Sequence, residues 1–515
     1  MPEEKLEIDK HRELLYAQEP RILETTAAFS SKIRSFPLDP KCHETEPRAL
    51  IVGGFVRDSM MGLYPKDADI EVYGVSAERL EEALLQLFPG QLNLVGKSFG
   101  ILKVSLGEGL ELDISIPRRE SQTGPRHGDA TVEGDPSMST IEAARRRDFT
   151  WNALGADILT GEVIDPFGGL ADLENKILRA TDPERFIDDP LRVWRAIQFI
   201  GRYNFEVDQN TFYLMQGMVF AGKLDHLPKE RTTEEIKKLL LKGSHVSRGL
   251  ETAKSIGIIE RYFPELAILE KTEQEPEWHP EGNVWIHTLM ALDVAAKLIR
   301  EDNSGLNEED KLSVMLGTLC HDLGKPSTTE MKDGKVRSHG HAEAGIEPTR
   351  ALLSKFAFSG DIAKAAEIIA SDHLKPGTLY REFEKGNLSD KQYTNAVRKL
   401  IKRIAPLSPQ VLITASEADS RGRTLPDVLT KPYNPGIKML EAIESGNLTQ
   451  EAKTGLVMGR DIITISKSMD KELNPGPQFG LIIAQVEQAR DNGTISTRDE
   501  ALKMLVELIE QIEPE

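Results

Sequence analysis

The stretch LIVGGFVRDSMMGLYPKDADIE, residues 50–71, decides how the first part of this chain folds. An apolar run ends in Gly53-Gly54, a segment of helical pattern follows, and Asp67 and Asp69 then stand two positions apart in a β-type run. Residues two apart on a strand project from the same face, so the two carboxylates repel unless a divalent cation bridges them. This order of features predicts an Mg²⁺ site held by Asp67 and Asp69.

The two glycines indicate what such a metal would serve. Because they lack a Cβ, Gly53 and Gly54 let the backbone come close to a triphosphate, whose charge the following helix N-terminus also favours. Arg57 and Asp58 lie in that helical segment and join the nucleotide-binding candidates. An Asp-x-Asp pair alone is more often a pair of solvated loop acids, so it is the combination that predicts a nucleotide site.

Motifs along the rest of the chain resemble those of a known family, in its order and roughly its spacing. GGFVRD and DAD match the GGxxRD and DxD of the class II tRNA nucleotidyltransferases and poly(A) polymerases. Later motifs of that family are similar to RRDFTWNAL at 146–154, IDPFGGLADLENKILRA at 164–180 and DDPLRVWRAIQF at 188–199. WHPEGNVWIHTLM, GTLCHDLGKP, SHGHAEAG and SEADSRGR resemble the HD-domain region of bacterial members, so the resemblance reaches from residue 48 to 425.

The order of β-type and helical patterns along the chain predicts an α+β protein. Several domains are expected, because 515 residues are too many for one core. Short β-type runs alternate with helical ones up to Asp165, and amphipathic helices then follow almost without interruption. The resemblance implies a small-sheet palm of polymerase-beta type, followed by all-α RNA-binding, HD and tail regions. The expected bounds are 1–46 for an N-terminal helical extension, 47–165 for the palm, 166–270 for a nucleotide-selecting and RNA-binding neck, 271–425 for the HD domain and 426–515 for a helical tail.

Asp113 is a third acid of interest in the palm. It lies in a predicted strand at 110–116, and the other strands expected there are 49–54, 67–74 and 101–106, with a helix at 77–88. If its strand neighbours 67–74, Asp113 adds a third catalytic charge beside the first two carboxylates. The alternative is a strand-end acid that faces solvent.

The residues after Asp113 predict a mobile loop, because 123–136 are Gly-rich and lack periodicity. Arg118 and Glu120 stand just before it, where the family shows an R-x-E pair. Further on, three consecutive arginines crowd positive charge that a triphosphate would relieve. The resemblance assigns Arg147 to phosphate and Asp148 to the ribose hydroxyls, with Asn152 as a helper; the alternative is a solvated Arg-Asp pair on a helix.

Asp189 and Arg192 carry the prediction about substrate choice. At i and i+3 on a helix whose first turn contains Pro190, their side chains can meet on one face. Together they complement a base edge with an exocyclic amine beside a ring-nitrogen acceptor, which cytosine and adenine present and guanine and uracil reverse. The motif resembles the family's EDxxR, with Asp188 where Glu is usual and Arg195 as a further nucleotide-binding residue. A capping Asp with an i+3 salt bridge is the alternative.

A second catalytic candidate lies among the histidines. His287, His321, Asp322 and Asp419 match the H…HD…D arrangement of the resembling HD domains, and His339, His341 and His373 are further candidate ligands. Imidazole and carboxylate together suit a transition metal such as Ni²⁺, Mn²⁺ or Co²⁺ better than Mg²⁺. Such a metal would activate water for phosphoester hydrolysis, and the alternative is an HD domain that survives as a scaffold.

Composition is compatible with an RNA partner without demonstrating one. The formal charge of −19, from 83 acids and 64 bases, means that a polyanion must be met by local basic clusters. Lys229, Arg231, Lys237 and Lys238 are the RNA-binding candidates, with a solvated helix face as the alternative.

The expected compartment is the cytosol. Two cysteines, Cys42 and Cys320, cannot build a disulfide framework, and no apolar run approaches the ~18 residues of a membrane span. Cys320 is better explained as core filler than as a metal ligand. No membrane association and no obligatory protein partner is indicated.

These motifs together predict a template-independent nucleotidyltransferase that adds CCA to tRNA 3′ ends from CTP and ATP. A poly(A) polymerase, or an enzyme that adds only CC or only A, is the first alternative on the same fold. Alternatives of another class are an HD phosphohydrolase with a vestigial palm and a non-catalytic RNA-binding protein.

Overall fold

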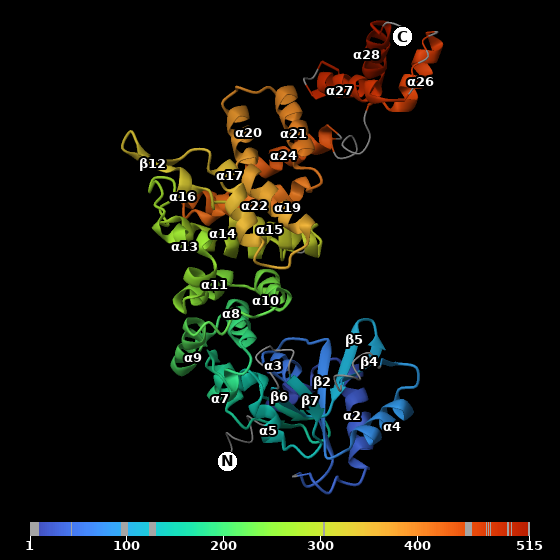
Figure 1. The fold of residues 1–515 in the computed structure, drawn as a ribbon, viewed down its shortest axis with the longest axis vertical. Helices are drawn as coiled ribbons and strands as arrows, with labels where there is room; N and C mark the ends of the chain where they lie inside the picture. Colours follow the sequence, from blue (N-terminus) through green and yellow to red (C-terminus); the bar gives the residue numbers. More distant parts are fainter. Residues whose placement is uncertain are drawn as a thin grey trace. The chain divides into compact units, whose positions relative to one another are not determined.

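A computed structural model of the chain describes residues 10–512 except 43, 94–100, 123–129, 302–303, 447, 449–455, 470, 472, 474, 492–493 and 496. The chain divides into two compact units. Unit 1 runs to Leu239 and includes Arg248–Ile258, and unit 2 comprises Leu240–Ser247 and the chain from Ile259 onward. A small-sheet palm followed by helical regions confirms the expected α+β class (Figure 1).

The palm is built on a seven-stranded sheet with the order β3-β4-β5-β2-β1-β8-β9. β2 and β5 run parallel, whereas β1 pairs antiparallel with both β2 and β8. Ala68, Ile70 and Val72 of β2 are buried and the intervening acids point to the other face, as the period-2 pattern predicts. The strands are β1 (Arg48–Val52), β2 (Asp67–Tyr73), β3 (Leu92–Asn93), β4 (Ile101–Gly107), β5 (Leu110–Ser115), β8 (Gly155–Asp157) and β9 (Glu162–Ile164).

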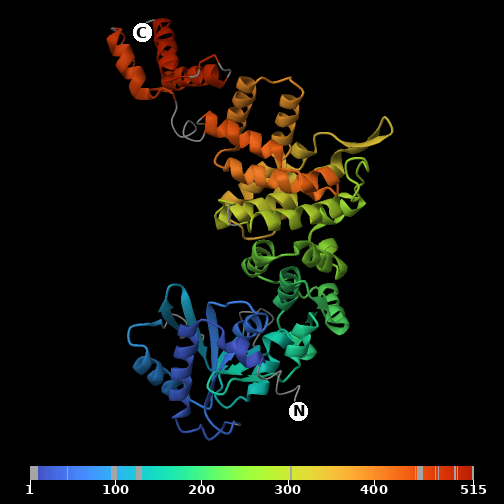
Figure 2. The ribbon, with the colours of Figure 1, turned by 180° about the vertical axis from the view of Figure 1, so that it is seen from behind.

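One face of this sheet is covered by the helices α2 (Pro20–Arg34) and α4 (Ala77–Leu87), as Figures 1 and 2 show. Ser30 of α2 donates a hydrogen bond to the Ala49 carbonyl of β1 at 3.3 Å, and Phe29 contacts the Phe88 ring at the end of α4. Helix α2, in the region before residue 47, is therefore packed on the palm by a buried apolar stripe.

The expected loop at 123–136 is only partly a loop. Residues 123–129 lie outside the described part of the chain, but β6 (Arg118–Gln122) and β7 (Ala130–Gly134) pair as an antiparallel ribbon. The prediction of irregular structure for 130–136 was therefore wrong over the residues of β7. The Gly-rich composition of this segment did not indicate a strand. β7 forms because its backbone hydrogen-bonds to β6, and the side chains of β7 do not signal that pairing.

The rest of unit 1 is helical and is anchored to the palm by aromatic packing. Trp151 stacks on Phe149 and meets Phe199 edge-to-face at 4.8 Å. Two short strands, β10 (Ile177–Leu178) and β11 (Glu206–Val207), pair in this region, which the sequence did not predict. The remaining helices are α3 (Gly54–Met60), α5 (Thr140–Arg145), η2 (Thr150–Asn152), α6 (Gly169–Glu174), α7 (Pro183–Phe186), α8 (Leu191–Tyr203), α9 (Gln209–Phe220), α10 (Lys229–Lys242) and α11 (Val246–Ser255).

Unit 2 has a core of closely packed helices around α14 (Val284–Leu298), α15 (Glu308–Cys320), α19 (Gly360–Asp372) and α22 (Pro409–Gly422). Two glycines permit the close approach. A Cβ on Gly317 of α15 would lie 2.5 Å from the Ile369 side chain of α19, and one on Gly422 of α22 would lie 2.9 Å from Ala291 of α14. These contacts bring the ends of the four helices together.

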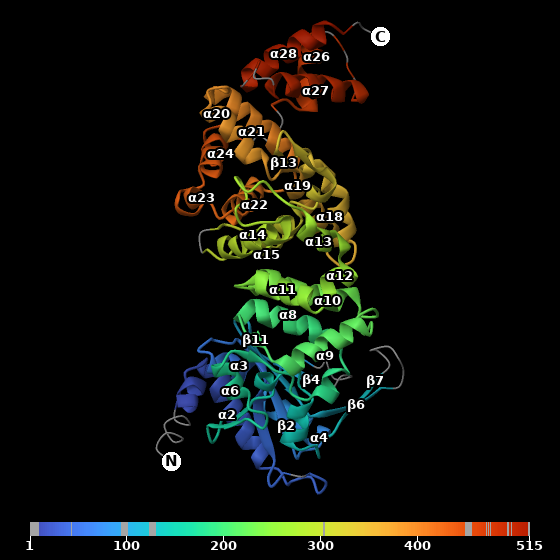
Figure 3. The ribbon, with the colours of Figure 1, turned by 90° about the vertical axis from the view of Figure 1, so that its left-hand side faces the viewer.

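The remainder of unit 2 contains a second apolar cluster, a short hairpin and a terminal bundle. The hairpin of β12 (Thr329–Lys332) and β13 (Lys335–Ser338) interrupts a region expected to be all-α. Figure 3 shows α26, α27 and α28 as a small bundle, which has its own core of buried residues such as Ile462 and Leu505. The other helices are α12 (Ile258–Tyr262), α13 (Pro264–Ala267), η3 (Ile268–Lys271), α16 (Lys325–Thr328), α17 (His341–Ala344), α18 (Ile346–Leu353), α20 (Lys375–Glu384), α21 (Asp390–Ile404), α23 (Pro426–Thr430), α24 (Asn434–Ser445), α26 (Gly459–Ser468), α27 (Pro477–Asp491) and α28 (Arg498–Glu510).

Among the described residues, no helix has both the length and the apolar character that crossing a membrane requires.

Two candidate active sites

The carboxylates of the palm gather on one face of the sheet. Asp67 and Asp69 are exposed on β2, and the parallel register sets Asp113 of β5 directly opposite Asp69. Lys103 of β4, which sequence reasoning missed, lies opposite Asp113, with its Nζ 3.0 Å from an Asp113 oxygen. Its signal in the sequence was its position in the adjoining strand, which becomes meaningful only once the strand order is known.

The acids of this face repel one another. Loss of hydration at the cavity raises the pKa of Asp69, Arg147 opposes that rise, and the like charges of Asp113 and Glu71 add to it. A divalent cation would relieve the repulsion, and its preference for carboxylate oxygens fits this donor set. Asp67, Asp69 and Asp113 are therefore chemically suited to hold one.

The paired glycines have a structural role that the sequence did not disclose. Gly53 has a φ of +68°, and a Cβ there would lie 2.5 Å from the Arg147 guanidinium. Arg147 itself pairs with Glu71 at 3.1 Å and approaches the Asn152 carbonyl at 3.5 Å. Gly53 therefore makes room for a half-buried cation beside the carboxylate face, in addition to any approach by a phosphate.

A chain of hydrogen bonds links the nucleotide-binding candidates. Arg57 donates to the Asn152 Oδ1 at 2.8 Å, and Asn152 Nδ2 donates to Asp148 Oδ1 at 2.8 Å. Arg195 Nε donates to the other Asp148 oxygen at 2.6 Å. Burial raises the pKa of Asp148, but the charge of Arg195 and the Asn152 hydrogen bond outweigh it and leave that pKa lowered. Asp148, predicted to contact the ribose, thus stays ionised while both its oxygens accept bonds from the protein.

The position of Asp189 differs from the expectation. It precedes α8 and does not lie on it, and its Oδ1 accepts from the Leu191 N–H at 3.0 Å as a cap. The guanidinium of Arg192 donates to the carbonyls of Arg185 and Arg146, at 2.7 and 2.6 Å. Asp189 therefore lies ahead of the first turn of α8, which begins at Leu191, but its side chain and that of Arg192 still line one cavity and interact electrostatically.

Arg231 lies closer to the nucleotide-binding candidates than its place in the sequence indicated. It was predicted to contact RNA, but its NH2 lies 3.4 Å from Asp189 Oδ2, and it shares a cavity with the nucleotide-binding candidates. The other predicted RNA contacts lie on the same helix, α10, where Lys237 pairs with Glu234 and Lys238 with Glu235.

These residues surround one cavity of about 420 Å³ in unit 1. Every predicted nucleotide-binding residue except Asp58 lines it, together with Asp69 and Arg231. Asp58 is held outside by Arg57 at 2.6 Å and by the Tyr203 hydroxyl at 3.0 Å, and Asp67 and Asp113 are also absent from its walls. The size suits a nucleotide, and the cationic wall suits its phosphates.

The ends of the core helices of unit 2 carry the second site. His287 lies on α14, His321 caps the C-terminus of α15, and Asp419 lies on α22. His287 Nε2 is 3.0 Å from Asp419 Oδ1 and 3.2 Å from His321 Nε2. Asp322 follows at 3.1 Å from His321 Nε2. All four predicted ligands are buried and close together.

Two of the three further candidate metal ligands join this centre, and the third does not. His341 and His373 join Asp322 in a second group whose ligand atoms lie within 4.8 Å of one another, whereas His339 is exposed and belongs to none of the clusters found among the described residues. His341 Nε2 is buried without a hydrogen-bond partner and lies 3.4 Å from Asp322 Oδ1.

The ring atom Nδ1 has a polar partner in each of the four clustered histidines, His287, His321, His341 and His373. His321, His341 and His373 each direct Nδ1 to the backbone carbonyl three residues earlier, at 2.7 to 2.9 Å. The Nδ1 of His287 lies 2.8 Å from Glu281. A proton on Nδ1 leaves the Nε2 lone pair directed into the cluster, which is the arrangement that orients imidazole ligands. The donor set fits a transition metal.

Electrostatics supports the neutral form for two of these histidines. Burial lowers the pKa of His373 to about 3 and also lowers that of His341, so both stay neutral. The pKa of His321 behaves differently, because burial lowers it but the charges of Asp322 and Asp419 outweigh burial and leave it raised. Burial opposes ionisation of Asp322 and Asp419, but the neighbouring cationic groups hold the pKa of each well below its ordinary value. Neutral imidazoles and ionised carboxylates are the forms that bind a metal.

Sequence reasoning missed two residues of this centre. His279 and Glu281 form a third group with His287, because Glu281 lies 2.8 Å from a ring nitrogen of each histidine. Burial lowers the pKa of His279 to about 4. The H-x-E spacing just ahead of α14 was the available signal, since a carboxylate behind a metal-binding imidazole is a common partner.

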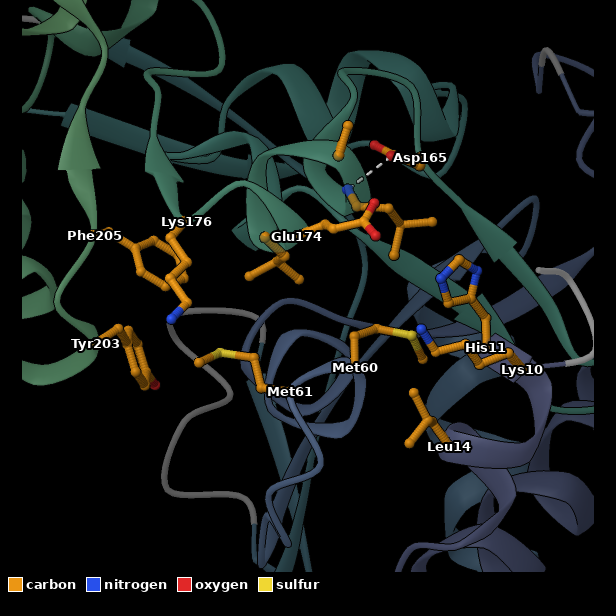
Figure 4. Close-up of a pocket in the computed structure, with 13 residues that line it drawn as sticks. Lys10, His11, Leu14, Met60, Met61, Asp165, Glu174, Lys176, Tyr203 and Phe205 are labelled. Atoms are coloured by element: carbon orange, nitrogen blue, oxygen red, sulfur yellow. Dashed lines mark hydrogen bonds between the residues drawn. The ribbon is translucent and has the colours of Figure 1, made fainter.

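Unit 1 also has a larger hollow of about 710 Å³ on which no predicted site residue lies (Figure 4). Met60, Met61 and Leu14 form an apolar part of its wall, and Asp165 is bound to backbone N–H groups of Gly169 and Leu170. None of the residues predicted to bind nucleotide or metal lines it, so we assign no chemistry to it.

Family models now define the class of protein. They match the poly(A) polymerase head domain at residues 49–179, the probable RNA- and SrmB-binding site of polymerase A at 204–269 and the HD domain at 284–405. The chain therefore belongs to the family of class II tRNA nucleotidyltransferases and poly(A) polymerases, in the form that carries an HD domain. Nucleotidyltransferases and HD proteins generally use divalent metals.

Solved structures of CCA-adding enzymes share the fold along nearly the whole chain. The Bacillus stearothermophilus CCA-adding enzyme in complex with CTP is 21% identical, with a TM-score of 0.61 over 95% of this chain and 98% of that one. The Thermotoga maritima enzyme complexed with tRNA is 18% identical, with a TM-score of 0.55 over 96% and 97%. A CCA-adding enzyme with ATP is 19% identical, with a TM-score of 0.58 over 95% and 94%.

Proposed function

We propose that this chain adds C and A residues to tRNA 3′ ends from CTP and ATP, with release of pyrophosphate and without a nucleic-acid template. The observation that carries the proposal is the cavity in unit 1, where Asp69, the Arg147 guanidinium and the Asp189–Arg192 pair converge. It offers a carboxylate for metal, a cation for phosphate, and an acceptor and a donor for a base edge within one space.

In this proposal Asp67 and Asp69 hold Mg²⁺, and Asp113 adds charge to the same face. The ion would lower the barrier for attack of the RNA 3′-hydroxyl on the α-phosphate and stabilise the leaving pyrophosphate. Arg147 and Arg195, which the protein already holds among carboxylates, bind and orient the triphosphate. Because Gly53 and Gly54 lack a Cβ, the backbone there can approach the triphosphate closely.

Base selection falls to Asp189 and Arg192. The Asp189 carboxylate would accept from the exocyclic amine of cytosine or adenine, and Arg192 would donate to the adjacent ring nitrogen. Arg231, 3.4 Å from Asp189 Oδ2, would orient that carboxylate. Because the groups are parts of the protein, selection requires no template strand.

The neck and α10 would contact tRNA, through Lys229, Lys237 and Lys238, by shape and phosphate charge, since A-form RNA offers little sequence to read. We propose the domain bounds 1–46, 47–165, 166–270, 271–425 and 426–515 for this division of labour, and a cytosolic location. The CCA-adding enzymes of similar fold bound to tRNA, CTP and ATP support these substrates.

We further propose that unit 2 hydrolyses phosphoesters at RNA 3′ ends, with Ni²⁺, Mn²⁺ or Co²⁺ held by His287, His321, Asp322 and Asp419. The metal would supply an activated water. In that reaction water adds to phosphorus, the ester oxygen leaves with a proton, and a terminal phosphate is released or a 2′,3′-cyclic phosphate becomes a monoester. The directed Nε2 atoms of the cluster support a bound metal.

The experiment that tests the first proposal offers purified protein tRNAs that lack one, two or three terminal nucleotides, with CTP and ATP separately and together, and sequences the products. Restoration of CCA from both nucleotides supports it. Addition of A alone in long runs would instead identify a poly(A) polymerase, and CC or a single A a partial enzyme. Absence of any addition would favour an HD phosphohydrolase or an RNA-binding protein with a vestigial palm.

A further inference from the structure

The cavity beside the histidine cluster has an aromatic wall that metal chemistry does not require. Trp278 is 54% exposed and lines this cavity of about 520 Å³, whereas Trp151, Trp194 and Trp285 are all buried. A large, flat indole left open to solvent at the wall of a polar cavity offers a stacking surface, and nucleobases are the usual partners of such surfaces in nucleic-acid-binding proteins.

The turn that carries Trp278 is held by its surroundings before any ligand binds. Trp278 closes a turn in which its backbone N–H donates to the Glu275 backbone carbonyl at 3.0 Å. The next residue, His279, packs its ring edge-to-face against His287 at 4.9 Å. On the other side, Glu275 accepts from the Val336 N–H of the β12–β13 hairpin at 2.9 Å. Fixing the turn on both sides lowers the entropy lost when a ligand binds.

The remaining wall supplies charge for a phosphate. Lys325 is buried, with its Nζ 2.6 Å from Asp322 and 2.7 Å from Gln274. Arg423 lies 3.7 Å from Asp419, and Arg381 reaches the same cavity from α20. Cations beside a metal-binding cluster attract a phosphoester, and the volume is in the range that holds a mononucleotide.

We propose that Trp278 stacks on the nucleobase next to the scissile phosphate, so that the site of unit 2 selects nucleotide phosphoesters, such as an RNA 3′ end, over phosphoesters without a base. This inference rests on the proposed phosphoester-hydrolysing function of the same site. Stacking uses the π-face that every base has, so the site distinguishes nucleotides from other phosphoesters without distinguishing the four bases.

Binding tests the proposal without turnover. Full-length protein loaded with Mn²⁺ is titrated with adenosine 3′-monophosphate and uridine 3′-monophosphate while tryptophan fluorescence is recorded, and equilibrium dialysis counts bound nucleotide. We expect both nucleotides to quench the wild type, and Trp278→Ala to lose the quenching and weaken one site roughly five- to a hundred-fold. Any nucleotide held by the palm appears in both proteins and cancels. Trp278→Phe, which keeps a ring, should retain most of the affinity in dialysis.

Two controls separate stacking from damage. Met331→Ala removes another exposed apolar side chain, on β12, that does not line the cavity, and should bind like the wild type. Affinity for inorganic phosphate and bound Mn²⁺ should be the same in all variants. Unchanged nucleotide affinity in Trp278→Ala, or an equal loss for nucleotide and inorganic phosphate, overturns the proposal.

Turnover gives a separate answer about the proposed hydrolysis. If the wild type hydrolyses adenosine 2′,3′-cyclic phosphate, Trp278→Ala should raise KM by a similar factor and leave kcat nearly unchanged, with no effect on glycerol 2-phosphate. If the wild type hydrolyses neither compound while its Trp278 fluorescence still responds to nucleotide, the hydrolytic function fails and the stacking role stands.

Discussion

Asp113 on β5 lies directly opposite Asp69 on β2, in a parallel strand pair of the palm sheet. Same-face positions on adjacent strands bring the two carboxylates together. Burial raises the pKa of Asp69, and the like charge of Asp113 adds to that rise. The arrangement is stable where a cation, either Lys103 or a metal, sits among the acids. It explains why this face of the palm is suited to metal-assisted phosphoryl transfer.

Asp69→Ala should abolish nucleotide addition and leave any hydrolysis by unit 2 intact, because the two clusters lie in separate units. Losing a metal ligand removes several kcal/mol of transition-state stabilisation, roughly a thousand-fold or more in rate. Single-turnover addition to tRNA lacking its terminal A measures the loss. Loss of both activities in a folded variant would contradict the separation.

Asp322→Ala should do the converse. Removing this carboxylate leaves His321, His341 and Lys325 without the anion they surround, so metal binding and hydrolysis of 2′,3′-cyclic phosphate should both fall. Nucleotide addition should stay near the wild-type rate. Metal content by mass spectrometry and hydrolysis with added Ni²⁺, Mn²⁺ or Co²⁺ provide the measurement, and wild-type protein that is inactive with all three would identify unit 2 as a scaffold.

Asp189→Ala should relax the choice of nucleotide. A hydrogen bond to a charged group contributes on the order of 1.5 to 3 kcal/mol, or roughly ten- to a hundred-fold in discrimination, so UTP or GTP should be incorporated measurably. Asp188→Ala is the matched control, because Asp188 is exposed and pairs with Arg185 at 3.7 Å, outside the nucleotide cavity. Kinetics with all four nucleotides on one tRNA decides, and uniform slowing without misincorporation would refute protein-directed selection.

Gly422→Ala should weaken the histidine centre from outside it. The added Cβ would lie 2.9 Å from Ala291 and push α22, with Asp419, away from α14, with His287. We expect a loss of about 1–3 kcal/mol in the stability of unit 2 and a lower affinity for metal. Gly377→Ala on α20, where a Cβ meets nothing within 4 Å, should be neutral or stabilising. Calorimetry and metal titration of the two variants test the pair.

Asp148→Asn should destabilise unit 1 in a pH-dependent way. Its folded pKa is lowered by Arg195 and Asn152 against the effect of burial, so its contribution is present above the unfolded pKa of ~3.9 and is lost as the pH falls through the folded value. At pH 7 the variant should be less stable by on the order of 3 kcal/mol, and the gap should close below about pH 4. Thermal unfolding across that range measures it; a gap independent of pH would exclude an ionic origin. Asp188→Asn should show no such effect.

The sequence by itself determined the class of fold, the four palm strands β1, β2, β4 and β5, and most of the residues that gather in the two candidate sites. Period-2 and helical patterns are local, so β2, β5 and α4 could be read from residue spacing alone. Likewise, the motif around His321-Asp322 predicted a cluster of imidazoles and carboxylates, and the structure brings these side chains together.

Only the tertiary structure decided which of these residues meet. Strand order placed Lys103 beside Asp113. Close helix packing at Gly317 and Gly422 brought together candidate metal ligands from four helices. The tertiary structure also placed Arg231, an expected RNA contact, beside Asp189. These contacts depend on register and on close approach between distant segments, which arise from the summed packing of the whole core, so a local pattern of residues does not encode them.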